Sequence, residues 1–290
     1  MNAGVPEGWG DLLACPMCKS AFAEAWRCGG CGELYVERDG APSLLPAALA
    51  SRVGDDVHRR WREALRGLDA WRARRRGAPA TVASVDPRVA ALVSALRPAG
   101  TVLDVGGGDG AKRAYLPAGV TRYLAVDPGA RGAGGPLEER GVAWWAVQGV
   151  GEFLPVQSES VDAVLSLSAM DYFMDVEGGV AEWARALRPA GRLGLFVTAH
   201  PPAVARARES PARVARGVRA LGPAVLAEVG PRGAFALAID GLRATAREHT
   251  RYLDEGALLA AVEARFRVDE VTRERGRYST TLRVVAERRL

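Results

Sequence analysis

Lysine is almost absent from this chain of 290 residues, because only Lys19 and Lys112 among its 39 basic residues are lysines. The other basic residues are arginines, and alanine and glycine are also abundant, a bias typical of a GC-rich coding sequence. We therefore do not count the excess of arginine by itself as a sign of function.

Long apolar runs are absent as well. No segment approaches the roughly 20 apolar residues that a membrane-spanning helix needs. The first ten residues also lack the charged and apolar regions of a secretion signal. We therefore expect no membrane partner and a cytoplasmic location. The length suits one α/β domain of about 200–250 residues with a small additional module.

Cysteine is missing from every part of the chain except residues 15–31. Its four members follow the spacing C-x2-C-x9-C-x2-C: Cys15, Cys18, Cys28 and Cys31. Two such knuckles can place four thiolates around one tetrahedral Zn²⁺ ion, a structural site with no open position. The alternative is a pair of disulfides in a secreted domain, which lacks a signal peptide to support it. We expect a zinc ribbon that folds apart from the rest of the chain.

Glycine gathers where a short apolar strand ends. Residues 101–105 read as a buried strand that contains Asp104, and four glycines follow it: Gly106, Gly107, Gly108 and Gly110. A second acid, Asp127, closes the next predicted strand, residues 121–127. A strand that enters a glycine-rich turn is how doubly wound α/β domains bind nucleotide-like ligands, and an acid about 20 residues later lies where a ribose would sit.

This pattern resembles motif I of the class I S-adenosylmethionine-dependent methyltransferases. The resemblance implies an α/β, Rossmann-like sheet of seven strands with an antiparallel last strand. It also implies S-adenosylmethionine as cofactor, with Asp104 near its methionine amino end. The resemblance places these residues at the cofactor: Asp104, Gly106, Gly107, Gly108, Gly110, Asp127, Val150, Gly151 and Ser168.

A dinucleotide site is the competing interpretation, because Gly106-x-Gly108-x-x-Ala111 also satisfies the relaxed Rossmann fingerprint. The carboxylate of Asp104 would repel a pyrophosphate, whereas S-adenosylmethionine offers an ammonium and a sulfonium. The sequence therefore favours the methyl donor over NAD(P). A tight turn that binds no ligand is the remaining alternative.

The remaining elements follow the same resemblance. We expect strands at 141–148, 160–168 and 192–198, a closing hairpin of strands 266–274 and 278–288, and helices at 88–96, 175–188 and 254–266. Only a short helix fits at 111–116, and none fits at 128–136. Val150 stands where the family carries an acid for the adenine amino group. Adenine must then be held by backbone and apolar contact, or by Gln148 or Glu152.

Three units follow from these landmarks: a zinc ribbon at 1–46, a basic helical linker at 47–87, and a methyltransferase domain at 88–290 with a substrate lid at 200–251. The candidates for a general base near the mouth are Asp171, Tyr172, His200 and His249. Methyl transfer needs alignment and the exclusion of water but no covalent nucleophile, so the absence of a nucleophile motif excludes nothing.

The methyl acceptor is expected to be a small molecule, such as a secondary metabolite. The alternative is RNA, because the ribbon is similar to modules that precede the catalytic domain in large-subunit rRNA guanine-N1 methyltransferases. Residues 52–76 and 200–251 each hold nine arginines against four acids, the kind of clustering that grips phosphate. A protein substrate and a non-catalytic binding module are further alternatives.

Overall fold

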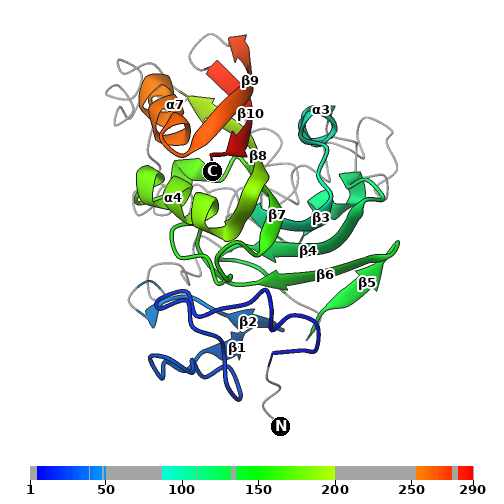
Figure 1. The fold of residues 1–290 in the computed structure, drawn as a ribbon, viewed down its shortest axis with the longest axis vertical. Coiled ribbons are helices and arrows are strands. Elements are labelled where there is room, and N and C mark those ends of the chain that lie inside the picture. Colours follow the sequence, from blue (N-terminus) through cyan, green and yellow to red (C-terminus); the bar gives the residue numbers. More distant parts are fainter. Residues whose placement is uncertain are drawn as a thin grey trace, which may run out of the picture.

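The chain is built around one eight-stranded sheet with the order β5-β6-β4-β3-β7-β8-β10-β9 (Figure 1). The computed structural model describes residues 5–38, 40–47, 49, 87–108, 110–131, 135–199, 253–275 and 280–289. The strands are β3 (Gly100–Val105), β4 (Val120–Val126), β5 (Leu137–Glu139), β6 (Val142–Val147), β7 (Val161–Leu167), β8 (Leu187–Ala199), β9 (Phe266–Arg275) and β10 (Thr280–Arg288).

Five neighbouring strands, β6, β4, β3, β7 and β8, run parallel, and β10 lies antiparallel between β8 and β9. This arrangement confirms the predicted α/β sheet with its antiparallel closing strands. Strand β5 adds an eighth strand at the edge, antiparallel to β6. The sequence pattern did not indicate it, since its three residues are all exposed and carry no apolar alternation.

Strand β8 begins at Leu187, five residues before the predicted start. Leu187 pairs with Val161 of β7, and the register then shifts before Ala163 pairs with Arg192. Ala190 has a φ of 61° within that shift. Residues 189–191, between the predicted helix 175–188 and the predicted strand 192–198, are therefore an irregularity inside the strand, and the prediction of a strand start at residue 192 was wrong.

Helices cover both faces of the sheet. On one face, α3 (Pro87–Leu96) packs Leu92 and Leu96 against β8, where a Cβ on Gly194 would lie 3.0 Å from Leu96. On the other face lie α4 (Val176–Ala186) and α7 (Glu255–Glu263) (Figure 1). Each of these two starts at an aspartate, Asp175 or Asp254, whose carboxylate accepts a hydrogen bond from the helix's first turn.

The connection from β6 to β7, residues 148–160, contains no helix. On the face of the sheet that α4 packs against, no helix of this connection covers β6. The N-terminal unit, described residues 5–38 and 40–46, covers it instead (Figure 1). Trp145 of β6 is 2% exposed and meets two tryptophans of that unit edge-on or tilted, with ring centroids 5.6 Å away for Trp9 and 5.7 Å for Trp26. These side chains belong to the same buried cluster as the core of the sheet.

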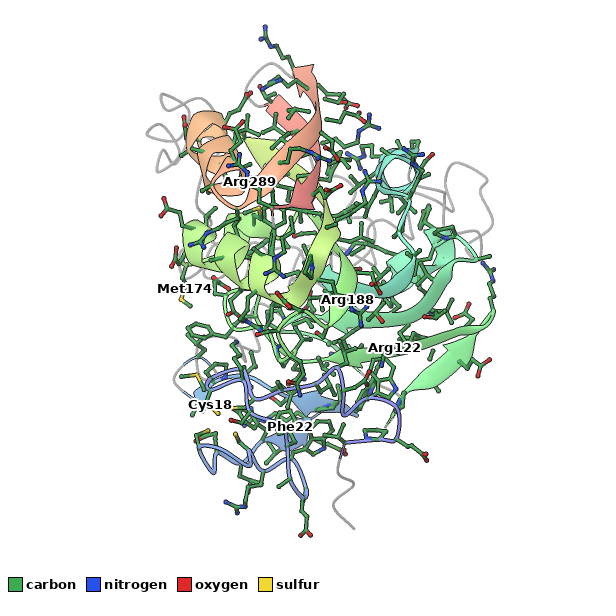
Figure 2. The ribbon with its side chains drawn as sticks, viewed as in Figure 1. Cys18, Phe22, Arg122, Met174, Arg188 and Arg289 are labelled. Carbon is green, nitrogen blue, oxygen red and sulfur yellow. The ribbon has the colours of Figure 1, made fainter. Side chains whose placement is uncertain are left out.

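Polar contacts also hold the N-terminal unit on the sheet. Its hairpin, β1 (Val36–Arg38) and β2 (Ala41–Ser43), leads into Leu44, whose amide donates to the Gln148 carbonyl at 2.8 Å. The ammonium of Lys19 lies 2.7 Å from Glu182 of α4. The guanidinium of Arg122, labelled in Figure 2, donates to Asp11 at 2.8 Å. The expectation that the ribbon folds apart from the α/β core was wrong, because the missing crossover helix leaves a face for it to bury.

No helix among the described residues is long and apolar enough to cross a membrane. The predicted basic helical linker and the predicted substrate lid lie outside the described residues, apart from the linker's first residues and last residue.

Candidate functional site

The glycine loop follows the carboxyl end of β3 as the sequence predicts. Gly106, Gly108 and Gly110 have φ angles of 73°, 59° and 75°, in the left-handed region that favours glycine. Gly107 has no room for a side chain, because a Cβ there would lie 2.8 Å from the Cβ of Ala125. The loop therefore presents bare backbone at the edge of the sheet, where a ligand can approach closely.

Asp127 directly follows β4 and turns its carboxylate toward this loop. Oδ2 accepts a hydrogen bond from the Gly108 amide at 3.1 Å, and Oδ1 accepts one from the Gly129 amide at 2.7 Å. These backbone donors hold the carboxylate beside the glycine loop, and a carboxylate is an acceptor that hydroxyl groups can donate to. This geometry fits the predicted contact with a ribose.

Asp104 is fully buried in β3 and already has a cationic partner. The ammonium of Lys112, on the short 3₁₀ helix η1 (Ala111–Tyr115), lies 3.0 and 3.1 Å from its two oxygens. The Tyr123 hydroxyl donates to the same carboxylate. Lys112 neutralises Asp104, so charge repulsion by Asp104 does not by itself argue against a pyrophosphate at this loop.

The expected adenine side of the site is apolar. Val150 is buried against Leu45 and Leu49, and partly buried Phe153 and Met174 pack on this cluster. Sequence reasoning missed the two leucines, which lie about 100 residues upstream of Val150 and belong to no local motif. The structure thus supplies an apolar wall where the resembling family carries an acid.

Gln148 and Glu152, the predicted alternatives for holding adenine, both face the protein itself. Gln148 Nε2 donates to the Ala130 carbonyl at 3.1 Å, and Glu152 Oε1 accepts from the Met174 amide at 2.7 Å. Burial raises the pKa of Glu152 above its usual range, although that amide hydrogen bond works in the opposite direction. Both side chains therefore order loops beside the site.

Of the other predicted mouth residues, Ser168 and Tyr172 follow β7, and Gly151 follows β6. Ser168 has a φ of 54°, and its amide donates to the Phe196 carbonyl at 2.8 Å. Gly151 lies against Phe173, where a Cβ would come within 2.1 Å of the ring. Tyr172, at the end of the 3₁₀ helix η2 (Met170–Tyr172), is 52% exposed. The side chain of Asp171, and all of His200 and His249, lie outside the described residues.

The four cysteines form a second site in the N-terminal unit, where Figure 2 labels Cys18. Their Sγ atoms all lie within 4.8 Å of one another, with 3.7 Å between Cys15 and Cys31 and 3.3 Å between Cys18 and Cys28. Four thiolates at about 2.3 Å from a tetrahedral Zn²⁺ would be about 3.8 Å apart. The Gly30 and Cys31 amides donate to the Cys28 sulfur at 3.4 Å. The cluster fits a metal ion.

Residues 103–195 match the profile of the family described as Methyltransferase domain. This segment is therefore similar to a methyltransferase domain. It spans β3 to β8 and includes the glycine loop, Asp104, Asp127, Val150 and Ser168. The family match agrees with the resemblance that the motif around Asp104 and Gly106–Gly110 indicated.

A curated relative is the nocamycin O-methyltransferase of Saccharothrix syringae, 31% identical over 185 residues. The match covers 58% of this chain and 66% of that protein, so it spans slightly less than two thirds of the relative's length.

Solved structures with a similar arrangement are much more distant in sequence. One is the geranyl diphosphate C-methyltransferase of Streptomyces coelicolor A3(2), at 12% identity and a TM-score of 0.46, covering 70% of this chain and 78% of that one. Another is the N-methyltransferase NodS of Bradyrhizobium japonicum WM9, at 11% identity and a TM-score of 0.42, covering 70% and 96%. Similarities of this size carry no argument about function.

Proposed function

We propose that the chain is an S-adenosylmethionine-dependent methyltransferase that acts on a small-molecule acceptor. The observation that carries the proposal is the family match over residues 103–195, which includes both the glycine loop after β3 and Asp127 after β4. The name of the relative, a nocamycin O-methyltransferase, supports an oxygen atom of a small molecule as the acceptor.

The donor, when bound, would supply a methyl group attached to a sulfonium sulfur. Transfer of that methyl group would convert the sulfonium into a neutral thioether, which is the leaving group. The chain's own residues have the task of binding and alignment, which contribute up to about 7–11 kcal/mol to such a displacement. In this proposal Asp127 holds the ribose hydroxyls, and Val150 with Leu45 and Leu49 packs on the adenine face. A hydroxyl acceptor also loses a proton, and Asp171, Tyr172, His200 and His249 remain the candidates for its base.

The charge of the N-terminal unit favours a small molecule over RNA. Residues 5–38 contain three basic side chains, Lys19, Arg27 and Arg38, against five acids, Glu7, Asp11, Glu24, Glu33 and Glu37. One of the three, Lys19, is already paired with Glu182. A unit that binds phosphates needs a basic exposed face. This unit is net acidic, and its two tryptophans, Trp9 and Trp26, pack against Trp145 of β6. We therefore propose that the ribbon, with one structural Zn²⁺, completes the enzyme's core.

The donor site is tested by calorimetric titration of S-adenosylhomocysteine into wild type and Asp127→Ala. A charge-assisted hydrogen bond is worth about 1.5–3 kcal/mol, so the variant should bind about 10- to 150-fold more weakly. Asp162→Ala is the matched control. The Asp162 carboxylate accepts a hydrogen bond from the Thr101 amide at 2.7 Å, near the amino end of β3. The Asp162→Ala variant should therefore bind S-adenosylhomocysteine with the affinity of wild type. Equal affinity of wild type and Asp127→Ala would refute the assignment.

The acceptor class is tested by mixing the protein with ribosomal RNA at 50 and 200 mM salt. An RNA enzyme that contacts six or more phosphates should lose about 10³-fold or more in affinity over that range. We expect only weak RNA binding. Sub-micromolar binding with that salt slope, together with transfer of a labelled methyl group into the RNA, would overturn the small-molecule proposal.

A further inference from the structure

The carboxylate of Glu152 joins two turns that follow different strands of the sheet. Glu152 lies in the turn 150–153 after β6, which is closed by a hydrogen bond from the Phe153 amide to the Val150 carbonyl at 3.2 Å. Its Oε1 accepts from the Met174 amide at 2.7 Å, and the Asp175 amide also donates to the carboxylate. Met174, labelled in Figure 2, ends the turn 170–174 that follows β7. One side chain of the first turn therefore holds the backbone of the second.

The ring of Phe173 fills the space between the same two turns. It is 5% exposed, and an added Cβ would come within 2.1 Å of it on Gly151 and within 2.6 Å of it on Gly179 of α4. It also meets Trp183 edge-on, with ring centroids 5.6 Å apart. Apolar packing of this kind keeps the turns in contact but is not directional. The hydrogen bonds to Glu152 are directional, so they fix the course of the backbone that follows Tyr172.

Under the proposed function the two turns serve different partners in the reaction. The turn 150–153 carries Val150, which we place at the adenine of the donor. The turn 170–174 carries Asp171 and Tyr172, two of the candidate bases for the acceptor. The rate of methyl transfer depends on the alignment of donor and acceptor. A contact that holds one turn on the other would therefore act on the reaction without touching either substrate.

We propose that Glu152 is a positioning residue that ties the turn of the candidate bases to the donor-binding turn, so that a bound donor orders the acceptor side of the site. This inference rests on the proposed function. It gives Glu152 a task other than the contact with adenine that the sequence left open. The two turns then open and close as one unit when Glu152 is present, and separately when it is not.

The test is amide hydrogen exchange, followed by NMR, in the full-length protein with and without S-adenosylhomocysteine. A ligand that binds only the closed form, at about 10 times its Kd, slows exchange through opening about 10-fold. In wild type this slowing should reach the Phe153 amide of the donor-binding turn and the amides of Met174 and Asp175. The Ala257 amide, which donates to Asp254 at 3.0 Å at the start of α7, should not respond.

Glu152→Met keeps the side-chain stem but removes the oxygen acceptors. The Met174 amide should then exchange about 10-fold faster without ligand, as expected for the loss of one hydrogen bond. With ligand, Phe153 should still be slowed about 10-fold and Met174 by no more than about twofold. Glu152→Gln retains an oxygen that can accept from the Met174 amide and should restore the wild-type response. Asp254→Ala is the matched control, a lost carboxylate–amide contact elsewhere that should leave the response of Met174 unchanged.

Two results would overturn the inference: no slowing of Met174 and Asp175 in a wild type that binds the ligand, or full slowing of Met174 in Glu152→Met. The first of these is measured on wild type alone, so it does not depend on the folding of a variant. Failure of Glu152→Gln to restore the response would also count against the inference. A wild type that does not bind S-adenosylhomocysteine would instead refute the proposed function itself.

Discussion

Removal of the proposed zinc ion should disable the distant donor site, because the N-terminal unit and the sheet share one buried cluster. The perturbation is Cys28→Ser, or treatment of wild type with a chelator. Structural zinc supplies about 10–16 kcal/mol in small zinc modules, which is comparable to or larger than the whole stability of a typical domain, about 5–15 kcal/mol. Loss of the metal should therefore unfold the N-terminal unit.

The free energy that the sheet would lose can be estimated from the buried side chains that would become exposed to solvent. Trp145, Val147, Leu154 and Val156 are at most 2% exposed and lie in the cluster that the N-terminal unit completes. Exposing each would cost about 1.5–3 kcal/mol, or about 6–12 kcal/mol together, which is again comparable to the stability of a domain. The loop 148–157, which carries Val150, would lose its backbone bonds to Leu44 and Leu12 as well.

The assay follows zinc by elemental analysis and S-adenosylhomocysteine binding by calorimetry on the same samples during stepwise chelation. We expect the zinc content and the number of S-adenosylhomocysteine binding sites to fall together. A partly chelated sample should contain only two populations, a metal-loaded one that binds S-adenosylhomocysteine and a metal-free one that does not. A metal-free protein that keeps wild-type affinity would refute the shared-core account. Purified wild type with no zinc would refute the metal assignment.

Three further outcomes follow from the packing. Trp145→Ala should lower the free energy of unfolding by about 3–5 kcal/mol in a urea titration, and an unchanged midpoint would contradict its place between sheet and ribbon. Glu152→Gln should raise the free energy of unfolding at pH values above the raised pKa of Glu152, because burial disfavours only the charged carboxylate. Near pH 4 the carboxyl is protonated and the variant should lose this advantage. A difference in the free energy of unfolding that does not change with pH would contradict this. Gly110→Ala should destabilise the fold more than Gly8→Ala. Both glycines have φ near 75°, but only at Gly110 would the added Cβ have neighbours, Trp144 and Tyr123, each 3.3 Å away. Equal melting temperatures of the two variants would contradict this prediction.

Local sequence patterns predicted those parts of the fold that depend on local chemistry. The apolar run at 101–105, the glycines after it and Asp127 each follow from what a buried strand and a tight turn require, and the structure places them together. Strand β5 has no such pattern, because its exposed residues are held only by pairing with β6.

The contacts that the sequence could not predict join distant residues or depend on the direction of a short turn. Leu45 packs with Val150 although about 100 residues separate them in the sequence, and no local pattern indicates such a contact. Lys112 lies only eight residues from Asp104, yet no local pattern indicates that the short 3₁₀ helix η1 places its ammonium on that carboxylate. Lys19, the other lysine, joins the ribbon to α4.

Binding of a methyl donor by the loop after β3 and the acid after β4 can be measured by titrating S-adenosylhomocysteine and, separately, NADH into the wild-type protein. We expect one S-adenosylhomocysteine bound per chain and no saturable binding of NADH. Saturable binding of NADH without binding of S-adenosylhomocysteine would contradict this expectation and identify the loop as a dinucleotide site.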